Sequence, residues 1–107
     1  MKRFKVTVTI DRPIGYRDNY GNIYPMNYGY VAGIIAGDSE EQDVYVLKEC
    51  EKLETFTGEV IAIIVRRNDV EDKWVVAQPG TLLSKEKIMN QTDFIEKYFD
   101  SEVLLLQ

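Results

Sequence analysis

The sequence is poor in the side chains that zinc sites and disulfides require. Its 107 residues include no histidine and one cysteine, Cys50. A single cysteine cannot form a disulfide within the chain, and a zinc site is normally built from several histidine or cysteine ligands. Neither a disulfide framework nor a zinc centre is therefore expected to organise this protein.

Long apolar runs are also missing. A membrane-spanning helix needs roughly 20 apolar residues, and the runs Val60–Val65 and Val103–Leu106 are far shorter. Residues 1–10 lack the unbroken apolar segment of a secretory signal. We therefore expect a cytoplasmic protein that does not enter a membrane, and we expect Val103–Leu106 to cover an edge of the core or a partner chain.

Basic residues are outnumbered by acidic ones, 13 to 18, which gives a formal charge of -5. This balance disfavours general attraction to nucleic acid or to an anionic membrane, and it makes cations the more suitable companions. With 45% apolar and 29% charged residues, the composition is that of a folded globular protein. The length allows one modest core, so a single domain over residues 1–107 is expected.

Alternating apolar and polar residues predict that the first two thirds of the chain is β-structure. Phe4, Val6, Val8 and Ile10 are separated by polar residues, which is the period-two pattern of a half-buried strand. The next apolar segment is interrupted by Gly29 and Gly33, as expected of a strand that bends. The predicted strands cover about residues 4–10, 23–35, 44–47, 59–67 and 73–78.

One helix is predicted after the break at Pro79-Gly80. Ser84 can cap it, and apolar residues recur at helical spacing as far as Phe99. Five short strands followed by a helix predict a mainly β protein of the α+β class. The expected architecture is a small, closed, five-stranded OB-like barrel over about residues 4–78, with a C-terminal helix over about residues 84–99.

Two strand connections are crowded with carboxylates. Residues 38–43 read Asp-Ser-Glu-Glu-Gln-Asp, and residues 69–72 read Asp-Val-Glu-Asp. Such residues are common in solvated turns, and that interpretation stays open for each loop taken alone. If both loops open on one rim of the barrel, however, their mutual repulsion favours a bound divalent cation. Oxygen ligands of this kind suit magnesium or calcium.

A third segment, Tyr24-Pro25-Met26-Asn27-Tyr28-Gly29-Tyr30-Val31, combines aromatic rings with hydrogen-bonding groups. Tyrosines in such a strand commonly belong to the core. Gly29 also allows another chain segment to approach closely, and the tips of Asn27 and Tyr28 can bind an oxyanion. The segment therefore predicts either part of the core or the lining of a phosphate pocket.

Taken together, the Tyr-Pro-x-Asn-Tyr-Gly-Tyr motif, the acidic loop that ends in Asp43-Val44 and the second acidic loop before Lys73 resemble the soluble, magnesium-dependent inorganic pyrophosphatases. The resemblance covers about residues 6–79. It implies a five-stranded barrel, several Mg²⁺ ions in the acidic loops and attack on pyrophosphate by a metal-activated water. The candidate metal ligands are the carboxylates of the two acidic loops that match this family's motifs or lie beside them: Asp38, Glu40, Asp43, Asp69, Glu71 and Asp72.

The same resemblance implies a phosphate site. Tyr28 matches the phosphate-binding tyrosine, Lys73 matches a phosphate-binding lysine, and Arg17, or Arg12, is the candidate cation near the N-terminus. Asp43 would hold metal, and Asp38 or Asp69 would accept the proton of the attacking water. The first loop lacks the family's glycine and proline, Glu71 stands two residues before the lysine where the family has aspartate, and a Tyr-Lys pair after the last barrel strand is missing.

The sequence thus predicts a magnesium-dependent inorganic diphosphatase with a small phosphate substrate and a homo-oligomeric state. One alternative is a non-catalytic or altered-specificity relative that binds magnesium and a phosphorylated small molecule. Another is an OB-like nucleic-acid module that stacks bases on its tyrosines, although the acidic loops argue against it. The tyrosines concerned are Tyr20, Tyr24, Tyr28 and Tyr30.

Overall fold

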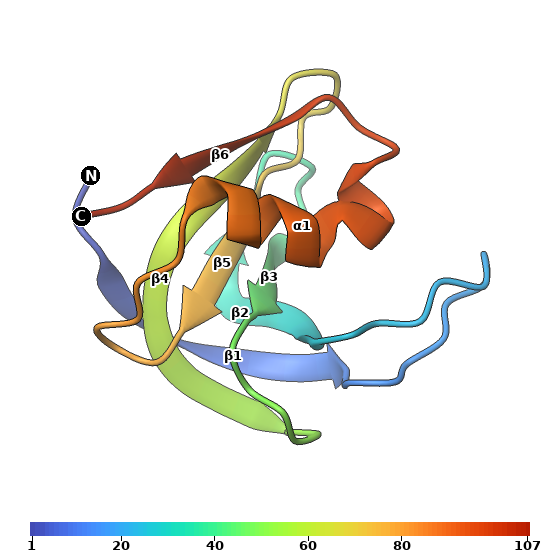
Figure 1. The fold of residues 1–107 in the computed structure, drawn as a ribbon, viewed down its shortest axis with the longest axis horizontal. Helices are drawn as coiled ribbons and strands as arrows, with labels where there is room; N and C mark the ends of the chain where they lie inside the picture. Colours follow the sequence, from blue (N-terminus) through green and yellow to red (C-terminus); the bar gives the residue numbers. More distant parts are fainter.

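The computed structural model describes all residues from 1 to 107 and contains six strands and one helix. Five strands close a barrel, because β1 pairs with both β2 and β4, and the sixth strand extends the sheet beyond β4 (Figure 1). The strand order is β1-β2-β3-β5-β4-β6, with β3 and β5 parallel and the other pairs antiparallel. The elements are β1 Phe4–Arg12, β2 Asn27–Ile35, β3 Glu41–Val46, β4 Thr55–Arg66, β5 Lys73–Ala77, α1 Lys85–Glu96 and β6 Ser101–Leu105.

The long strand β4 closes the barrel by pairing on both sides. Its first half pairs with β1, from Phe4 opposite Val60 to Thr9 opposite Thr55, and its second half pairs with β5 and β6. At the join between β1 and β2, Gly29 lies against the backbone of Thr9, where a Cβ atom would collide with the carbonyl group. The expected close approach at Gly29 is therefore present.

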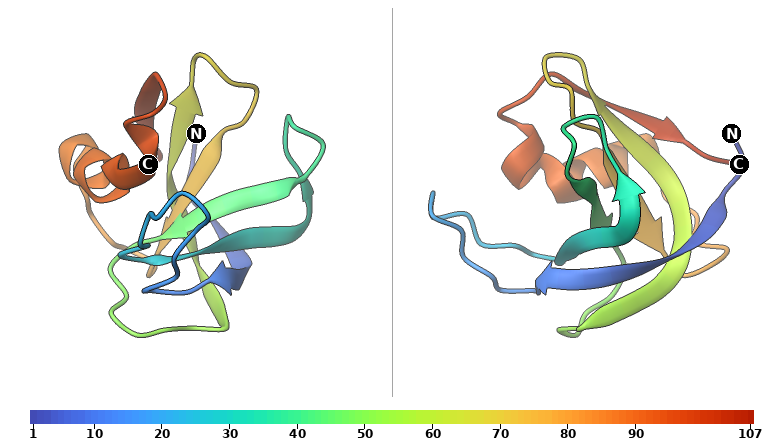
Figure 2. Two further views of the ribbon diagram at one scale, coloured as in Figure 1. Left: turned by 90° about the vertical axis from the view of Figure 1, so that its right-hand side faces the viewer. Right: turned by 180° about the vertical axis from the view of Figure 1, so that it is seen from behind.

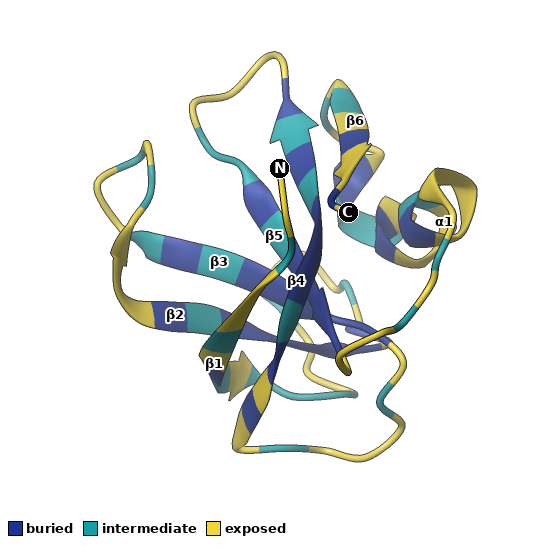
Figure 3. Cartoon of the chain, turned by 90° about the vertical axis from the view of Figure 1, so that its left-hand side faces the viewer, coloured by how far each residue is buried: buried dark blue, intermediate teal, exposed yellow.

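Apolar residues on both faces of the central strands form two core clusters. On β3, Val44 and Val46 belong to one cluster, whereas Tyr45 belongs to the other, together with Ile88 of α1. Alternate residues of a strand point to opposite faces, so the sheet is buried on both sides in this region. Figure 3 shows the buried positions concentrated on β3, β4 and β5, while the connecting loops are largely exposed.

The predicted barrel and helix are confirmed, but the helix is not the last element. It begins as expected, with the backbone N–H of Lys87 donating to Ser84 Oγ at 3.1 Å, and it ends at Glu96 rather than near Phe99. Residues 101–105 then form β6 along β4, and Val103 and Leu106 are buried in the core. The apolar tail thus covers an edge of the core, which was one of its two expected roles.

The two acidic connections lie beside each other at one end of the barrel, as Figure 2 shows. Gly37, in the turn between β2 and β3, packs so tightly against the carbonyl of Val70 that a Cβ atom would collide with it. Residues 13–26 form a long connection that projects on the same side as the C-terminal end of α1 (Figures 1 and 2). The chain has no helix of the length and apolar character needed to cross a bilayer.

Candidate active site

A cleft of about 650 Å³ lies where the 13–26 connection, the strands β2, β3 and β5 and the C-terminal end of α1 meet. Its charged lining residues are balanced, with three cationic and three acidic side chains, and its other lining residues are mostly aromatic. The lining comprises Arg12, Asp18, Tyr20, Asn22, Tyr24, Tyr28, Asp43, Tyr45, Arg66, Glu71, Lys73, Ile95, Tyr98 and Phe99.

Lys73 is the centre of the cleft's polar group. Lys73 is the first residue of β5 and is only 5% exposed, and its ammonium donates to Asp43 Oδ2 at 2.7 Å and to Tyr28 Oη at 2.9 Å. It also forms an ion pair with Glu71, two residues earlier. Three separate chain segments therefore deliver a hydroxyl and two carboxyl groups to one lysine.

Asp43 and Glu71 approach each other as well as the lysine, and they titrate differently. Burial, followed by a hydrogen bond to Asp43, holds the pKa of Glu71 above its ordinary value. Burial opposes ionisation of Asp43 too, but bonds from Glu71 and Lys73 outweigh it and lower the pKa of Asp43. The two pKa values move apart because two negative charges this close together repel each other.

Tyr28 is a neutral hydroxyl in this group. Burial, reinforced by the negative charge of Asp43, raises its pKa well above the ordinary value. Its ring packs edge to face against Tyr24 and Tyr45, with centroids 5.4 and 5.1 Å away. Tyr28 is thus a core residue whose hydroxyl also reaches the base of the cleft, and the binding of phosphate by that hydroxyl stays a prediction.

Arg12 supplies a second cation, held against aromatic rings. Its guanidinium donates to Tyr24 Oη at 2.5 Å and lies 5.3 to 5.6 Å from the ring centroids of Tyr16, Tyr24 and Tyr28. Cation–π contacts of this kind fix a guanidinium while leaving some of its donors free. Arg17, in contrast, is exposed and does not line the cleft. The structure therefore assigns the N-terminal cation of the cleft to Arg12.

Arg66 is the third cation, and it is paired inside the protein. It donates to both carboxylate oxygens of Glu96, at 3.0 and 2.6 Å, and its guanidinium lies 3.7 Å from the ring centroid of Phe99. The remaining nitrogen, Nη1, lies 3.6 Å from Asp69 and 4.0 Å from Glu71. The bonds to Glu96 outweigh burial and raise the pKa of Arg66 further, so this charge is permanent.

The carboxylate of Glu96 is fully partnered at the end of α1. Besides Arg66, it accepts from Tyr45 Oη at 2.8 Å and from Ser101 Oγ at 2.7 Å. Burial disfavours the charge, but the bonds from Arg66, Ser101 and Tyr45 outweigh it and lower the pKa of Glu96. This network joins α1 and β6 to the floor of the cleft.

The other acidic candidates lie outside the cleft. Asp38 accepts the backbone N–H of Glu40 at 3.0 Å within their own turn, and Asp69 accepts that of Val70 at 2.7 Å. None of the four remaining candidates lines the cleft, namely Asp38, Glu40, Asp69 and Asp72. No three His, Cys, Asp or Glu side chains anywhere in the chain form a group that could hold a metal ion. The expected convergence of six carboxylates is therefore reduced to the pair Asp43 and Glu71.

Arg66 and Glu96 stand in none of the motifs of the sequence, although the position of each within its strand or helix indicates that it is buried. Arg66 continues the alternate positions 60, 62 and 64 of β4, all of which are buried, so its side chain had to enter the core. Glu96 follows the buried Ile88 and Thr92 at intervals of four on the helix. A cationic residue on the buried face of β4 and an acidic residue on the buried face of α1 together predict a buried ion pair.

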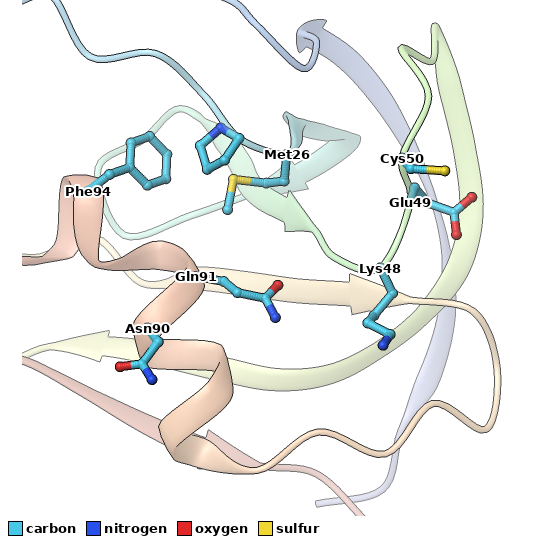
Figure 4. A pocket seen from close by; sticks show the side chains of 8 residues that line it. Met26, Lys48, Glu49, Cys50, Asn90, Gln91 and Phe94 are labelled. Atoms are coloured by element: carbon cyan, nitrogen blue, oxygen red, sulfur yellow. The ribbon is translucent and has the colours of Figure 1, made fainter.

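A second pocket, of about 600 Å³, lies on the other side of Phe94 between α1 and residues 48–50 (Figure 4). Phe94 packs against Tyr24 with ring centroids 5.0 Å apart, so these two rings lie between the pocket and the cleft. In Figure 4 the Cys50 thiol points away from the other labelled side chains, and the polar side chains that line the pocket do not gather into a cluster. The lining of this pocket therefore shows no recognisable catalytic or metal-binding arrangement.

Comparison with solved structures identifies the fold. An inorganic pyrophosphatase from Ehrlichia chaffeensis superimposes with a TM-score of 0.72 over 95% of this chain and 86% of its own, at 14% identity. The enzymes from Neisseria gonorrhoeae and Helicobacter pylori each give 0.66, at 18% and 16% identity, and cover 88% and 94% of this chain and 73% and 82% of their own. The chain has the fold of an inorganic pyrophosphatase. No protein-family model and no curated protein sequence matches it.

Proposed function

We propose that this protein hydrolyses a phosphoric anhydride, of which inorganic pyrophosphate is the simplest, with the help of a divalent cation. The observation that carries the proposal is the group around Lys73, in which Asp43, Glu71 and Tyr28 meet at the base of a cleft in a pyrophosphatase fold. Arg12 and Lys73 would bind phosphate oxygens, and Tyr28 would donate a hydrogen bond to one of them.

The carboxylates in the cleft could bind magnesium, although they provide ligands for fewer Mg²⁺ ions than the sequence resemblance implied. Mg²⁺ is commonly held by one or two carboxylates and completes its coordination with water and substrate phosphate oxygens. Asp43 and Glu71 are such a pair. The charged residues of the cleft lining sum to zero, so a bound pyrophosphate would need a cation to balance its negative charge. When bound, the ion would neutralise phosphate charge and acidify a water molecule.

The residues of the chain have separate parts in such a reaction. The oxygen of water bonds to one phosphorus while the bond from that phosphorus to the bridging oxygen breaks, which gives two phosphates and releases a proton. The Asp43 and Glu71 pair would receive that proton, and Glu71 is the better acceptor of the two because its pKa is held above its ordinary value. Lys73 and Arg12 would stabilise charge on the equatorial and leaving oxygens.

Purified protein is expected to release phosphate from pyrophosphate in the presence of Mg²⁺ and to stop in excess chelator. The measurement is colorimetric phosphate release with added magnesium and with excess chelator. A metal-loaded protein that binds pyrophosphate and releases no phosphate would contradict the catalytic proposal.

That contrary result would favour a second function, namely binding of a phosphorylated small molecule without turnover. The observation in its favour is the buried Arg66, which lies against Asp69 and Glu71, both implied as metal ligands by the sequence. A fixed guanidinium next to these carboxylates competes with a metal ion for them. Binding and turnover of pyrophosphate, measured separately, distinguish the two functions.

Replacing Tyr28 by phenylalanine is expected to lower kcat/KM for pyrophosphate about ten- to a hundredfold, because a hydrogen bond to a charged group contributes roughly 1.5–3 kcal/mol. The ring stays in the core and Lys73 keeps its two carboxyl partners, so the melting temperature should change little. Tyr30→Phe removes the hydroxyl of a half-buried tyrosine outside the cleft and is the matched control. A Tyr28 variant that loses stability but keeps its turnover would show that the hydroxyl serves only the core.

A further inference from the structure

The cleft is larger and more aromatic than a site for inorganic phosphate requires. Its volume of about 650 Å³ falls in the range of roughly 300–1,000 Å³ that is typical of sites for drug-sized organic ligands. Seven of its 14 lining residues are hydrophobic, and of these only Tyr28 hydrogen-bonds within the polar group around Lys73. The cleft thus has a charged base, suited to a diphosphate, and an apolar remainder that a diphosphate alone leaves uncovered.

Two exposed tyrosines lie on the rim of this cleft. Tyr20 belongs to the 13–26 connection and is 91% exposed, and Tyr98 follows the end of α1 and is 63% exposed. Neither ring is among the residues of the two core clusters. Segments almost 80 residues apart in the sequence therefore each contribute a largely exposed tyrosine to the lining of the same cleft.

The loop that carries Tyr20 is firmly braced. The carboxylate of Asp18 accepts the backbone N–H groups of Tyr20 and Asn22, each at 2.9 Å, and the side-chain amide of Asn22 at 2.9 Å. Gly21 takes the positive φ of 85° that the turn needs, and Arg17 bridges to Ile23 across its base. These bonds fix the backbone of the loop at the rim of the cleft, which lowers the conformational cost of using Tyr20 to stack on a ligand.

We propose that the substrate is an organic diphosphate with an aromatic ring, of the nucleoside diphosphate class. This inference rests on the proposed function. The diphosphate would occupy the charged floor of the cleft near Arg12 and Lys73, and the nucleobase would stack on Tyr20 or Tyr98. Water would attack the terminal phosphorus as its bond to the bridging oxygen breaks, giving a nucleoside monophosphate, a phosphate and a proton. The aromatic faces accept any nucleobase, because every base has a π-face.

The test uses two probes that cannot be hydrolysed, because a methylene group replaces the bridging oxygen. α,β-Methylene-ADP carries the aromatic base, and methylenediphosphonate lacks it. Calorimetry in the presence of Mg²⁺ should give tighter binding of the nucleotide probe by about fivefold or more, since stacking contributes roughly 1–3 kcal/mol per base. Tyr20→Ala or Tyr98→Ala should weaken that probe about fivefold or more and leave the diphosphonate unchanged.

Two controls sharpen the comparison. Tyr98→Phe keeps the aromatic face and should keep the preference, and Leu82→Ala removes a side chain that is 86% exposed but lies outside the cleft. Equal binding of both probes, or equal weakening of both by the tyrosine variants, would overturn the inference while leaving the proposed function intact. If neither probe binds, the proposed function fails as well.

Discussion

Replacing Glu96 by alanine is expected to lower the free energy of unfolding by about 3–5 kcal/mol, because it leaves the buried guanidinium of Arg66 without its main partner. Glu96 is 2% and Arg66 5% exposed, and the two nitrogen–oxygen bonds between them measure 3.0 and 2.6 Å. The same change removes the acceptor of Tyr45 and Ser101. In a domain of this size, the melting temperature should fall by more than about 12 °C.

The neighbouring pair Arg67 and Asp100 provides a matched control, because it has the same chemistry at the surface. Its nitrogen–oxygen distance is 2.8 Å, but the two side chains are 51% and 59% exposed. Water and salt screen an exposed pair, so Asp100→Ala should change stability little. Urea unfolding of both alanine variants measures the contrast. Equal effects at Glu96 and Asp100 would contradict the role given to the buried network.

Two further variants separate charge from packing. Replacing Arg66 by methionine together with Glu96 by leucine removes both charges and should cost far less than Glu96→Ala alone. The pKa of Glu96 in the folded protein lies below its ordinary value of 4.5, so its carboxylate stabilises the fold above pH 4.5. The stability difference between wild type and Glu96→Gln should therefore shrink as the pH falls below 4.5.

The barrel could be predicted from the sequence because its strands alternate and its breaks contain glycine and proline. The boundaries were less accurate, since β4 begins at Thr55 and the helix ends at Glu96. The strand β6 was missed for a physical reason. Five residues after a helix carry too few alternations to distinguish a strand from an apolar tail, and only the unpaired edge of β4 decides between them.

The candidate site was predictable where one segment carries several signals. Tyr28, Asp43, Glu71 and Lys73 stand in short motifs, and the structure brings these four together. Acidic turns such as residues 38–40 look the same in sequence whether they bind metal or only hydrogen-bond their own backbone. Long-range pairing, as between Arg66 and Glu96, depends on where the helix packs, which local patterns do not encode.

Replacing Asp43 by asparagine is expected to reduce magnesium-dependent phosphate release at least about a hundredfold. The change removes a carboxylate from the only acidic pair in the cleft, and with it both charge for a cation and capacity for a proton. The fold should persist, because Glu71 still pairs with Lys73 and an amide oxygen can still accept from the ammonium. Steady-state phosphate release and a melting curve on the same sample measure both expectations.

Asp38→Asn is the comparison that tells a one-ion cleft from a larger metal centre. Its oxygen can still accept the Glu40 N–H, so the turn should be unchanged, and its side chain lies outside the cleft. If Asp43 and Glu71 alone hold the cation, this variant should retain activity within about tenfold of the wild type, well above Asp43→Asn. A loss as large as that of Asp43→Asn would mean that the two adjacent acidic connections, in contact at Gly37 and Val70, rearrange around further ions when metal binds.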